Sequence, residues 1–308
     1  MTADEGVLAI DAGQTGIKVR IPTAQGVRDD VFPGIRTHEP LLPQLAAAVR
    51  TALDHAGATV ATVTAGVSGL TSREADAAAL LARIADRGVR DVRLAHDSTT
   101  SFLGAMGDGR GAVIAAGTGV VTLAVGPSRV ARVDGWGNLI GDAGSGYWIG
   151  REALDAVMRS FDGRGPDTGL REIAEERWPD LTQAYISLQS GEDRVQIIAS
   201  FAEHVARLAT EGDPVSQHIT VRAGGELAHS VETALRRVRE DDQALGVCAI
   251  GGVFRSAQLR EAFVSHLSAS GLASQLVDPL GHGIDGAVAL GQLAPGHPLA
   301  ADVSIAHA

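Results

Sequence analysis

The first third of the sequence alternates short apolar runs with polar turns. Val7–Asp11 and Ile17–Ile21 are apolar runs on either side of a glycine-containing turn, which predicts a β-hairpin. A third strand is expected at Val27–Phe32. The next segment, Leu41–Ala56, repeats its apolar residues at helical spacing and is followed by Gly57. It therefore predicts a helix that ends at a left-handed glycine.

Strands and helices alternate in the following segment. Val60–Val67 and Val89–Ala95 are rich in branched apolar residues and predict two buried strands. Arg73–Arg87 lies between them and has a helical pattern that Ser72 could cap. Another helix is expected from Ser98. This order of elements predicts an α/β domain whose sheet is at least partly parallel.

Residues 112–125 repeat the pattern of residues 8–21. Both segments contain an apolar run, a small residue with glycine, a Thr-Gly pair and a second apolar run. Asp11 of the first copy aligns with Ala115 of the second, so only the first hairpin carries a carboxylate. Two such hairpins can resemble each other by chance, but the likeness favours two related domains.

Residues 134–150, DGWGNLIGDAGSGYWIG, form a glycine-rich loop ahead of a helix that is expected to begin near Ser145. A helix N-terminus offers unpaired N–H groups and a partial positive charge, so we expect this end to suit a polar or anionic ligand. Trp136 and Asp142 stand among the glycines and favour a binding loop over a plain surface loop. Trp148 falls on the helix, where a core position is expected.

The rest of the chain is mostly helical as far as residue 240, with breaks at prolines and glycine. Val247–Ile250 and Gln275–Val277 predict two further strands, and Asp285–Leu293 predicts a helix. Residues 294–308 read as a loose tail.

Composition narrows the classes of function. Among the 308 residues the formal net charge is −11 and there is no basic run, which disfavours nucleic acid as a partner. Lys18 is the only lysine, so a Gly-rich phosphate loop that ends in Lys-Ser or Lys-Thr is excluded. Phosphate chemistry would have to rest on backbone N–H groups, hydroxyls and a metal ion.

The single Cys248 excludes an internal disulfide and a cysteine zinc site. The N-terminus lacks the basic segment of a signal peptide. The longest apolar run is shorter than the ~18 residues of a membrane span. We therefore expect a cytoplasmic protein with no membrane partner.

The two hairpins suggest a polyphosphate site. Glycines let backbone amides approach phosphate oxygens, and Thr15 and Thr118 add hydroxyl donors. Asp11 ends a strand, where it could hold Mg²⁺ through water, or could merely cap a turn. Asp97 also follows a strand, where it could take a proton from an attacking hydroxyl, or could be a helix N-cap. His38, in the loop before a helix, is left open.

These motifs together resemble a known family. In chain order they are Asp11-Ala-Gly-Gln-Thr15, Asp97, Ala116-Gly-Thr-Gly119, Gly135-Trp-Gly137 with Gly141-Asp142-x-Gly-Ser-Gly146, and Gly251-Gly252-Val253. They resemble the N-acetylglucosamine kinase and BadF-type ATPase family, of the sugar kinase/Hsp70/actin superfamily. The resemblance implies two ribonuclease H-like (actin-like ATPase) domains with a cleft between them that closes on ligands. It places them at residues 1–107 and 108–284, the second with a helical insertion, with a helix at about 285–295 packing back on the first and a tail at 296–308.

The resemblance also implies an ATP- and Mg²⁺-dependent kinase of an amino sugar, N-acetylglucosamine or a close relative. Asp97 would be the general base and Asp11 the metal-linked carboxylate. The expected ATP contacts are Asp11, Gly13, Thr15, Gly117, Thr118, Gly119, Ala209, Gly251 and Gly252. The expected sugar contacts are Gly135, Trp136, Gly137, Asp142 and His38. The expected partner is a small-molecule sugar, and a homodimer is left open.

The chain departs from the family pattern at several positions. Val120 and Val121 replace polar residues. The expected sugar-contacting Asn is absent, and a residue within 36–38 takes its place. Arg36 there would favour a ligand with a carboxylate, such as N-acetylmuramic acid. One alternative is an ATPase that activates a CoA-ester dehydratase or reductase, which the lone Cys248 disfavours because such activators bind an iron–sulfur cluster. Another is a member that binds sugar without turning it over.

Overall fold

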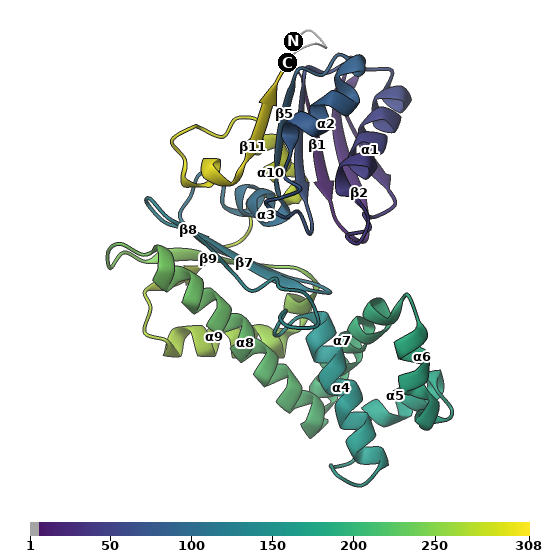
Figure 1. The fold of residues 1–308 in the computed structure, drawn as a ribbon. Coiled ribbons are helices and arrows are strands. Elements are labelled where there is room, and N and C mark those ends of the chain that lie inside the picture. The colour runs from purple at the N-terminus through teal and green to yellow at the C-terminus, as the bar shows by residue number, and fades with distance from the viewer. Residues whose placement is uncertain (1–5) are drawn as a thin grey trace. The chain divides into compact units, whose positions relative to one another are not determined.

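The computed structural model describes residues 6–308, which form two compact units (Figure 1). Of the described residues, unit 1 comprises 6–111, 125–130 and 278–308, and unit 2 comprises Ala112–Ala124 and Ala131–Val277. The chain therefore passes between the units at 111/112 and 277/278, where the sequence predicted 107/108 and 284/285. The short excursion at 125–130 was not predicted.

Unit 1 contains a six-stranded sheet in the order β11-β5-β4-β1-β2-β3. The strands are β1 (Val7–Ala12), β2 (Ile17–Thr23), β3 (Gly26–Phe32), β4 (Thr62–Val67), β5 (Asp91–His96) and β11 (Ser304–His307). β1, β2 and β3 form the predicted antiparallel meander, and β1, β4 and β5 run parallel. β11 pairs antiparallel with β5, so the prediction of a loose tail at the end of the chain was wrong.

Helices cover both faces of this sheet. They are α1 (Leu41–Ala56), α2 (Ala77–Ile84), α3 (Asp97–Met106) and α10 (Gly283–Leu290), with short 3₁₀ turns at Ala85–Arg87 and Pro298–Asp302. α1 packs on α2, and α3 packs on α10 (Figure 1). α1 ends as predicted at Gly57, with φ of 55°. α2 begins later than predicted, because the carboxylate of Asp76, rather than Ser72, accepts the amide of Ala79.

Glycines set the approach of α3 to its neighbours. A Cβ on Gly104 would lie 2.1 Å from the carbonyl oxygen of His282, and one on Gly286 would lie 1.7 Å from that of Thr100. Either methyl group would force the helices apart. This packing fixes the beginning of α3, which carries the candidate site residue Asp97.

Unit 2 contains a five-stranded sheet in the order β10-β9-β6-β7-β8. The strands are β6 (Gly111–Ala116), β7 (Val120–Val125), β8 (Val130–Val133), β9 (Leu245–Ile250) and β10 (Ser274–Leu276). β8 was not predicted. β6 and β7 form the predicted second hairpin, and β9 pairs parallel with β10.

The helices of unit 2 form its larger part. They are α4 (Gly146–Phe161), α5 (Leu170–Arg177), α6 (Ala184–Ser190), α7 (Arg194–Glu211), α8 (Pro214–Val238) and α9 (Ala257–Ala269), with 3₁₀ turns at Leu181–Gln183 and Gly252–Arg255. One apolar core joins β6, β7, α4, α7, α8 and α9. α4 begins next to Ser145 as predicted, and the Ser145 hydroxyl caps it, with its oxygen 3.2 Å from the amide of Trp148.

Candidate active site

Asp11 and Asp97 lie at the carboxyl ends of parallel strands in unit 1. Asp11 of β1 is in register with Gly66 of β4, and Gly66 is in register with Ala95 of β5. Asp97 follows β5 by one residue. The carboxyl ends of strands in an open α/β sheet are where such folds bind ligands.

Asp97 is the first residue of α3 and not its N-cap. The cap is His96, whose Nδ1 atom accepts the amide of Ser98 at 3.1 Å. The carboxylate of Asp97 accepts the hydroxyl of Ser68 and lies 2.9 Å from the same Nδ1 atom. Nδ1 can accept from Ser98 when it is unprotonated or donate to Asp97 when it is protonated, but it cannot do both. The helix-cap alternative for Asp97 is therefore replaced by a carboxylate that accepts a hydrogen bond from Ser68 and lies beside the His96 ring.

Burial raises the pKa of Asp11, and the charge of Asp97 raises it further, while Lys18 and His282 oppose the shift. The Asp11 carboxylate lies against the start of α10: a Cβ added to Gly283 would be only 2.8 Å from its Oδ2 atom. Two carboxylates that repel each other in a partly buried site fit a divalent cation, which would relieve the repulsion. Mg²⁺ needs few protein carboxylates because it keeps several waters.

The remaining unit 1 candidates lie in two loops. Gly13 begins the turn between β1 and β2, where its amide donates to the carbonyl of Gly16 at 3.0 Å. Thr15 is exposed at the tip of this turn. His38 has a side chain that is 80% exposed, and Arg36 pairs with Glu39 at 3.0 Å. The guanidinium proposed from sequence to bind a carboxylate ligand thus already has a carboxylate partner.

The turn between β6 and β7 rests on the N-terminus of α4. The amide of Gly146 donates to the carbonyl of Gly117 at 2.8 Å, and that of Tyr147 donates to the carbonyl of Thr118 at 3.0 Å. The next two amides of the helix bond to Ser145, one to its side chain and one to its carbonyl. The expectation that this helix end offers unpaired amides to a ligand was wrong, because the hairpin turn occupies them.

A pocket of about 700 Å³ in unit 2 brings together several residues predicted to bind nucleotide. Gly117 and Thr118 line one part of it and Gly252 another. Its wall from α7 consists of Gln196, Ala199, Ser200, Ala202, Glu203, Val205, Ala206 and Thr210. Ala209 is fully buried, so the prediction that it contacts adenosine is not matched by any exposed side-chain surface. The carbonyl of Ala209 instead accepts side-chain amides from α8 and α9.

Gly251 must be glycine for a steric reason. Its φ is +105°, and a Cβ there would lie 2.2 Å from the carbonyl oxygen of Ala116. An L-residue rarely adopts this φ, and the contact is far below van der Waals distance. Gly251 therefore lets the chain turn closely past the end of β6, before Gly252 enters the pocket.

Two aspartates organise the glycine-rich loop that precedes α4. Asp134 accepts the amides of Gly135, Asp142 and Ala143 at 2.8, 2.8 and 2.9 Å. Asp134 and Asp142 are the non-glycine residues with positive φ among those described, at 59° and 61°. Asp134 was missed from sequence, although the Asp-Gly pair that it begins is a turn signal.

Asp142 is a buried carboxylate, 8% exposed, that joins this loop to the second hairpin. Its Oδ1 atom accepts the amide of Gly137 at 3.2 Å, and its carboxylate also accepts the amide of Val120. Burial raises its pKa to about 6, assisted by the charge of Asp134 and opposed by both amides and by Arg132. Trp136 of the same loop is 66% exposed. The loop thus presents an open aromatic face from a backbone held by the carboxylates of Asp134 and Asp142.

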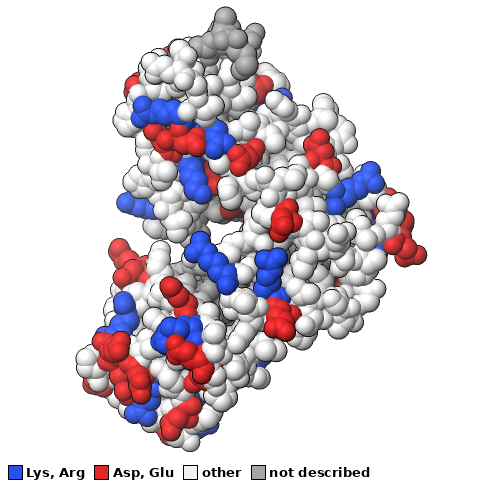
Figure 2. All heavy atoms as spheres, turned by 180° about the vertical axis from the view of Figure 1, so that it is seen from behind, with Lys and Arg blue, Asp and Glu red and all other residues white. Residues whose placement is uncertain are grey.

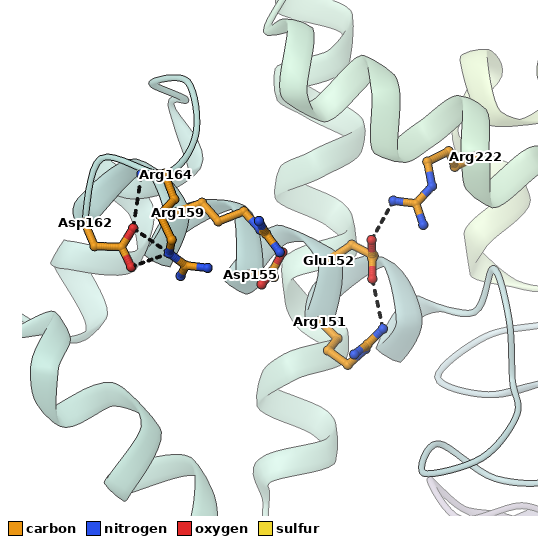
Figure 3. Close-up of polar contacts among 7 residues, drawn as sticks. All are labelled: Arg151, Glu152, Asp155, Arg159, Asp162, Arg164 and Arg222. Atoms are coloured by element: carbon orange, nitrogen blue, oxygen red, sulfur yellow. Dashed lines mark hydrogen bonds and ion pairs between the residues drawn. The ribbon is translucent and has the colours of Figure 1, made fainter.

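A second pocket, of about 450 Å³, lies between α4 and the first turns of α8. Its charged walls are already paired. Glu152 bonds to Arg222 at 2.6 Å and to Arg151 at 2.9 Å, and Arg159 bonds to Asp155 at 2.6 Å (Figure 3). Of these ion pairs, Glu152–Arg222 connects α4 to α8 and the other two lie within α4. None of the predicted site residues lines this pocket.

Charged side chains on the described surface are mixed in sign. On the face in Figure 2, Lys and Arg side chains alternate with Asp and Glu in small groups. Within residues 6–308, no helix has the length and apolar character to cross a membrane.

Comparison with known proteins adds the following similarities. The model of the BadF/BadG/BcrA/BcrD ATPase family matches residues 8–291. The chain is 30% identical over 172 residues to an N-acetylmuramic acid/N-acetylglucosamine kinase from Clostridium acetobutylicum, which covers 52% of this chain and 54% of that protein. It is 31% identical over 138 residues to an N-acetyl-D-glucosamine kinase from Dictyostelium discoideum, which covers 43% of each. The matches thus span about half the length of these curated relatives.

The fold is also found among solved structures. A candidate N-acetylglucosamine kinase from Chromobacterium violaceum superimposes with a TM-score of 0.72 at 23% identity, over 94% of this chain and 99% of that one. The likeness confirms the predicted α/β fold of actin-like sugar kinases.

Proposed function

The chain belongs to the BadF/BadG/BcrA/BcrD ATPase family, and we propose that it transfers the γ-phosphoryl group of ATP to a hydroxyl of an amino sugar. The observation that carries the proposal is the 700 Å³ pocket of unit 2, which Gly117, Thr118 and Gly252 line together. This pocket has the size of a small-molecule site, and glycine backbone beside a threonine hydroxyl suits phosphate oxygens. Gly119 and Gly251 complete the turns that shape it.

Asp97 is the proposed general base. The Ser68 hydroxyl holds its carboxylate beside the His96 ring at the start of α3, so it can accept a proton in one orientation. As the sugar hydroxyl attacks the γ-phosphorus, its proton passes to Asp97, the new P–O bond forms and ADP leaves. Phosphoryl transfer requires little from a protein beyond positioning, charge neutralisation and this base.

Asp11 is the proposed carboxylate for Mg²⁺, through a bound water, with Gly13 and Thr15 of the adjacent turn contacting phosphate. Mg²⁺ would supply the neutralisation of phosphate charge when it is bound. The chain's only lysine, Lys18, already acts electrostatically on Asp11. Because no other lysine exists to neutralise the phosphates, a metal ion is the proposed source of that positive charge.

The proposed sugar loop is residues 134–142. Trp136 offers an apolar face for the C–H side of a sugar ring, Gly135 and Gly137 allow close approach, and Asp142 can accept a hydroxyl hydrogen bond. The two curated relatives are kinases of N-acetylglucosamine, one of which also takes N-acetylmuramic acid. We therefore propose N-acetylglucosamine or N-acetylmuramic acid as the acceptor. His38, exposed in unit 1, stays a proposed contact only.

The test is ADP formation by the purified full chain with ATP and Mg²⁺, measured for N-acetylglucosamine, N-acetylmuramic acid, glucosamine and glucose. We expect one of the two N-acetylated sugars to have the highest kcat/KM. Asp97→Asn serves as the inactive control, with ATP binding measured separately by calorimetry. Preference for glucose, or bound ATP with no sugar phosphorylated, would contradict the proposal.

A further inference from the structure

Arg132, near the end of β8, contacts the proposed sugar loop through Gly135 and Trp136. Its guanidinium carbon lies 5.7 Å from the centre of the Trp136 ring, and its Nη2 atom donates to the carbonyl of Gly135 at 2.8 Å. Its charge also acts on Asp142, whose pKa it lowers. Arg132 therefore contacts or acts electrostatically on three of the four loop residues proposed to bind sugar, Gly135, Trp136 and Asp142.

The donors of this guanidinium are only partly used. In the described part of the chain, Nε of Arg132 is buried without an acceptor, and no ion pair to a carboxylate is formed. A buried donor without an acceptor is costly, which favours a ligand oxygen as its partner. By contrast, Arg36 is bonded to Glu39 and Arg222 to Glu152, so each of these guanidinium groups already has a carboxylate partner.

From this geometry we propose that Arg132 is a specificity-determining residue that binds a carboxylate carried by the sugar. A ring stacked on Trp136 would place its substituents beside the guanidinium, where a carboxylate can accept charge-assisted hydrogen bonds. The inference rests on the proposed function of the loop as the sugar site. The ligand chemistry is an N-acetylated sugar with an acidic ether substituent, for which N-acetylmuramic acid is the probe.

Arg132 should act on the acidic sugar far more than on the neutral one. A hydrogen bond to a charged group contributes enough that its loss changes kcat/KM by roughly 10- to 100-fold. We expect Arg132→Gln to lower kcat/KM for N-acetylmuramic acid by that factor, mostly through KM. For N-acetylglucosamine the same variant should lower kcat/KM by a smaller factor, because the neutral sugar has no carboxylate, so the ratio of the two kcat/KM values should fall. Arg132→Lys should retain part of the preference, since it keeps the charge but not the planar group.

The matched control is Arg129→Gln. Arg129 is exposed and directly precedes the same strand, β8. The substitution Arg129→Gln therefore removes one positive charge, as Arg132→Gln does. It should leave the ratio of the two kcat/KM values unchanged. If Arg132 merely supported the loop through Gly135 and Trp136, its replacement would lower kcat/KM for both sugars by the same factor. That result would overturn the proposal.

Binding measured without turnover separates this inference from the kinase assignment. Calorimetric titration of each sugar into the full chain gives a Kd whether or not phosphate is transferred. Binding of N-acetylmuramic acid that Arg132→Gln weakens, with no phosphorylation of any sugar, would support Arg132 and refute the kinase proposal. Phosphorylation of N-acetylglucosamine, with N-acetylmuramic acid neither bound nor phosphorylated, would support the kinase proposal and overturn the inference for Arg132.

Discussion

The raised pKa of Asp142 has a consequence for stability that Asp142→Asn should expose. Folding moves this pKa from 3.8 to about 6, mainly because the carboxyl is buried. An acid whose pKa rises on folding favours the folded state when protonated. Its contribution is complete below the unfolded pKa and is lost as the pH rises through the folded pKa. Asparagine is neutral throughout and can still accept the amide of Gly137.

The magnitude follows from the shift. About two pKa units correspond to ~3 kcal/mol of stability lost by the wild type between acid and neutral pH. Roughly half of this loss, ~1.4 kcal/mol, falls between pH 5 and pH 8, because the unfolded carboxyl is already ionised at pH 5. Asp142→Asn should therefore gain about that much relative to the wild type over this interval. Other titrating groups cancel in the difference between the two proteins.

The assay is urea unfolding of both proteins at pH 5 and pH 8, followed by tryptophan fluorescence. All three tryptophans, Trp136, Trp148 and Trp178, lie in unit 2, so the signal reports the unit that contains Asp142. A difference between the variants that is the same at both pH values would show that the folded carboxyl titrates normally, and the burial argument would fail.

Three further predictions concern the proposed chemistry and its scaffold. Asp97→Asn should lower kcat by ~100-fold or more, the usual contribution of a positioned base, with circular dichroism and ATP affinity preserved; near-normal turnover would remove Asp97 from the mechanism. Asp11→Asn should impair turnover severely and raise the Mg²⁺ concentration for half-maximal rate, whereas wild-type turnover in excess chelator would exclude the metal-linked carboxylate. Gly251→Ala should lower the free energy of unfolding by at least ~2 kcal/mol in chemical denaturation, because Gly251 has a positive φ and a Cβ there would clash with Ala116. Gly252→Ala should unfold as the wild type does, because its Cβ would meet no atom within 4 Å. Equal stability of the two variants would refute the steric argument.

Local patterns predicted the elements whose causes are local. The β1–β3 meander, α1 with its terminal glycine, and the start of α4 near Ser145 each follow from alternation or helical spacing within a few residues. The carboxylates at the ends of β1 and β5 could be located for the same reason. A strand that ends in Asp is visible in the sequence without knowledge of its partners.

The parts that sequence could not supply depend on contacts between distant segments. The α4 N-terminus looked open because the carbonyls of Gly117 and Thr118 that fill it lie about thirty residues earlier. Ala209 could not be distinguished from Ala206 by type, since only the packing of α7 decides which faces the pocket. Arg132 lies on a four-residue strand too short to leave a periodic signal.

The pairing of β11 with β5 also determines when the sheet of unit 1 can be completed during translation. Residues 304–307 complete the edge of a sheet whose neighbouring strand, residues 91–96, is translated roughly 200 residues earlier. At about 5–20 residues per second, β5 waits on the order of 10–40 s for this partner. During that interval the nascent chain holds the strand that leads to Asp97 with one edge unpaired, a surface prone to pairing with other chains. All of unit 2, residues 112–124 and 131–277, is translated within this interval, so its strands are available before β11 completes the sheet of the unit that contains Asp97.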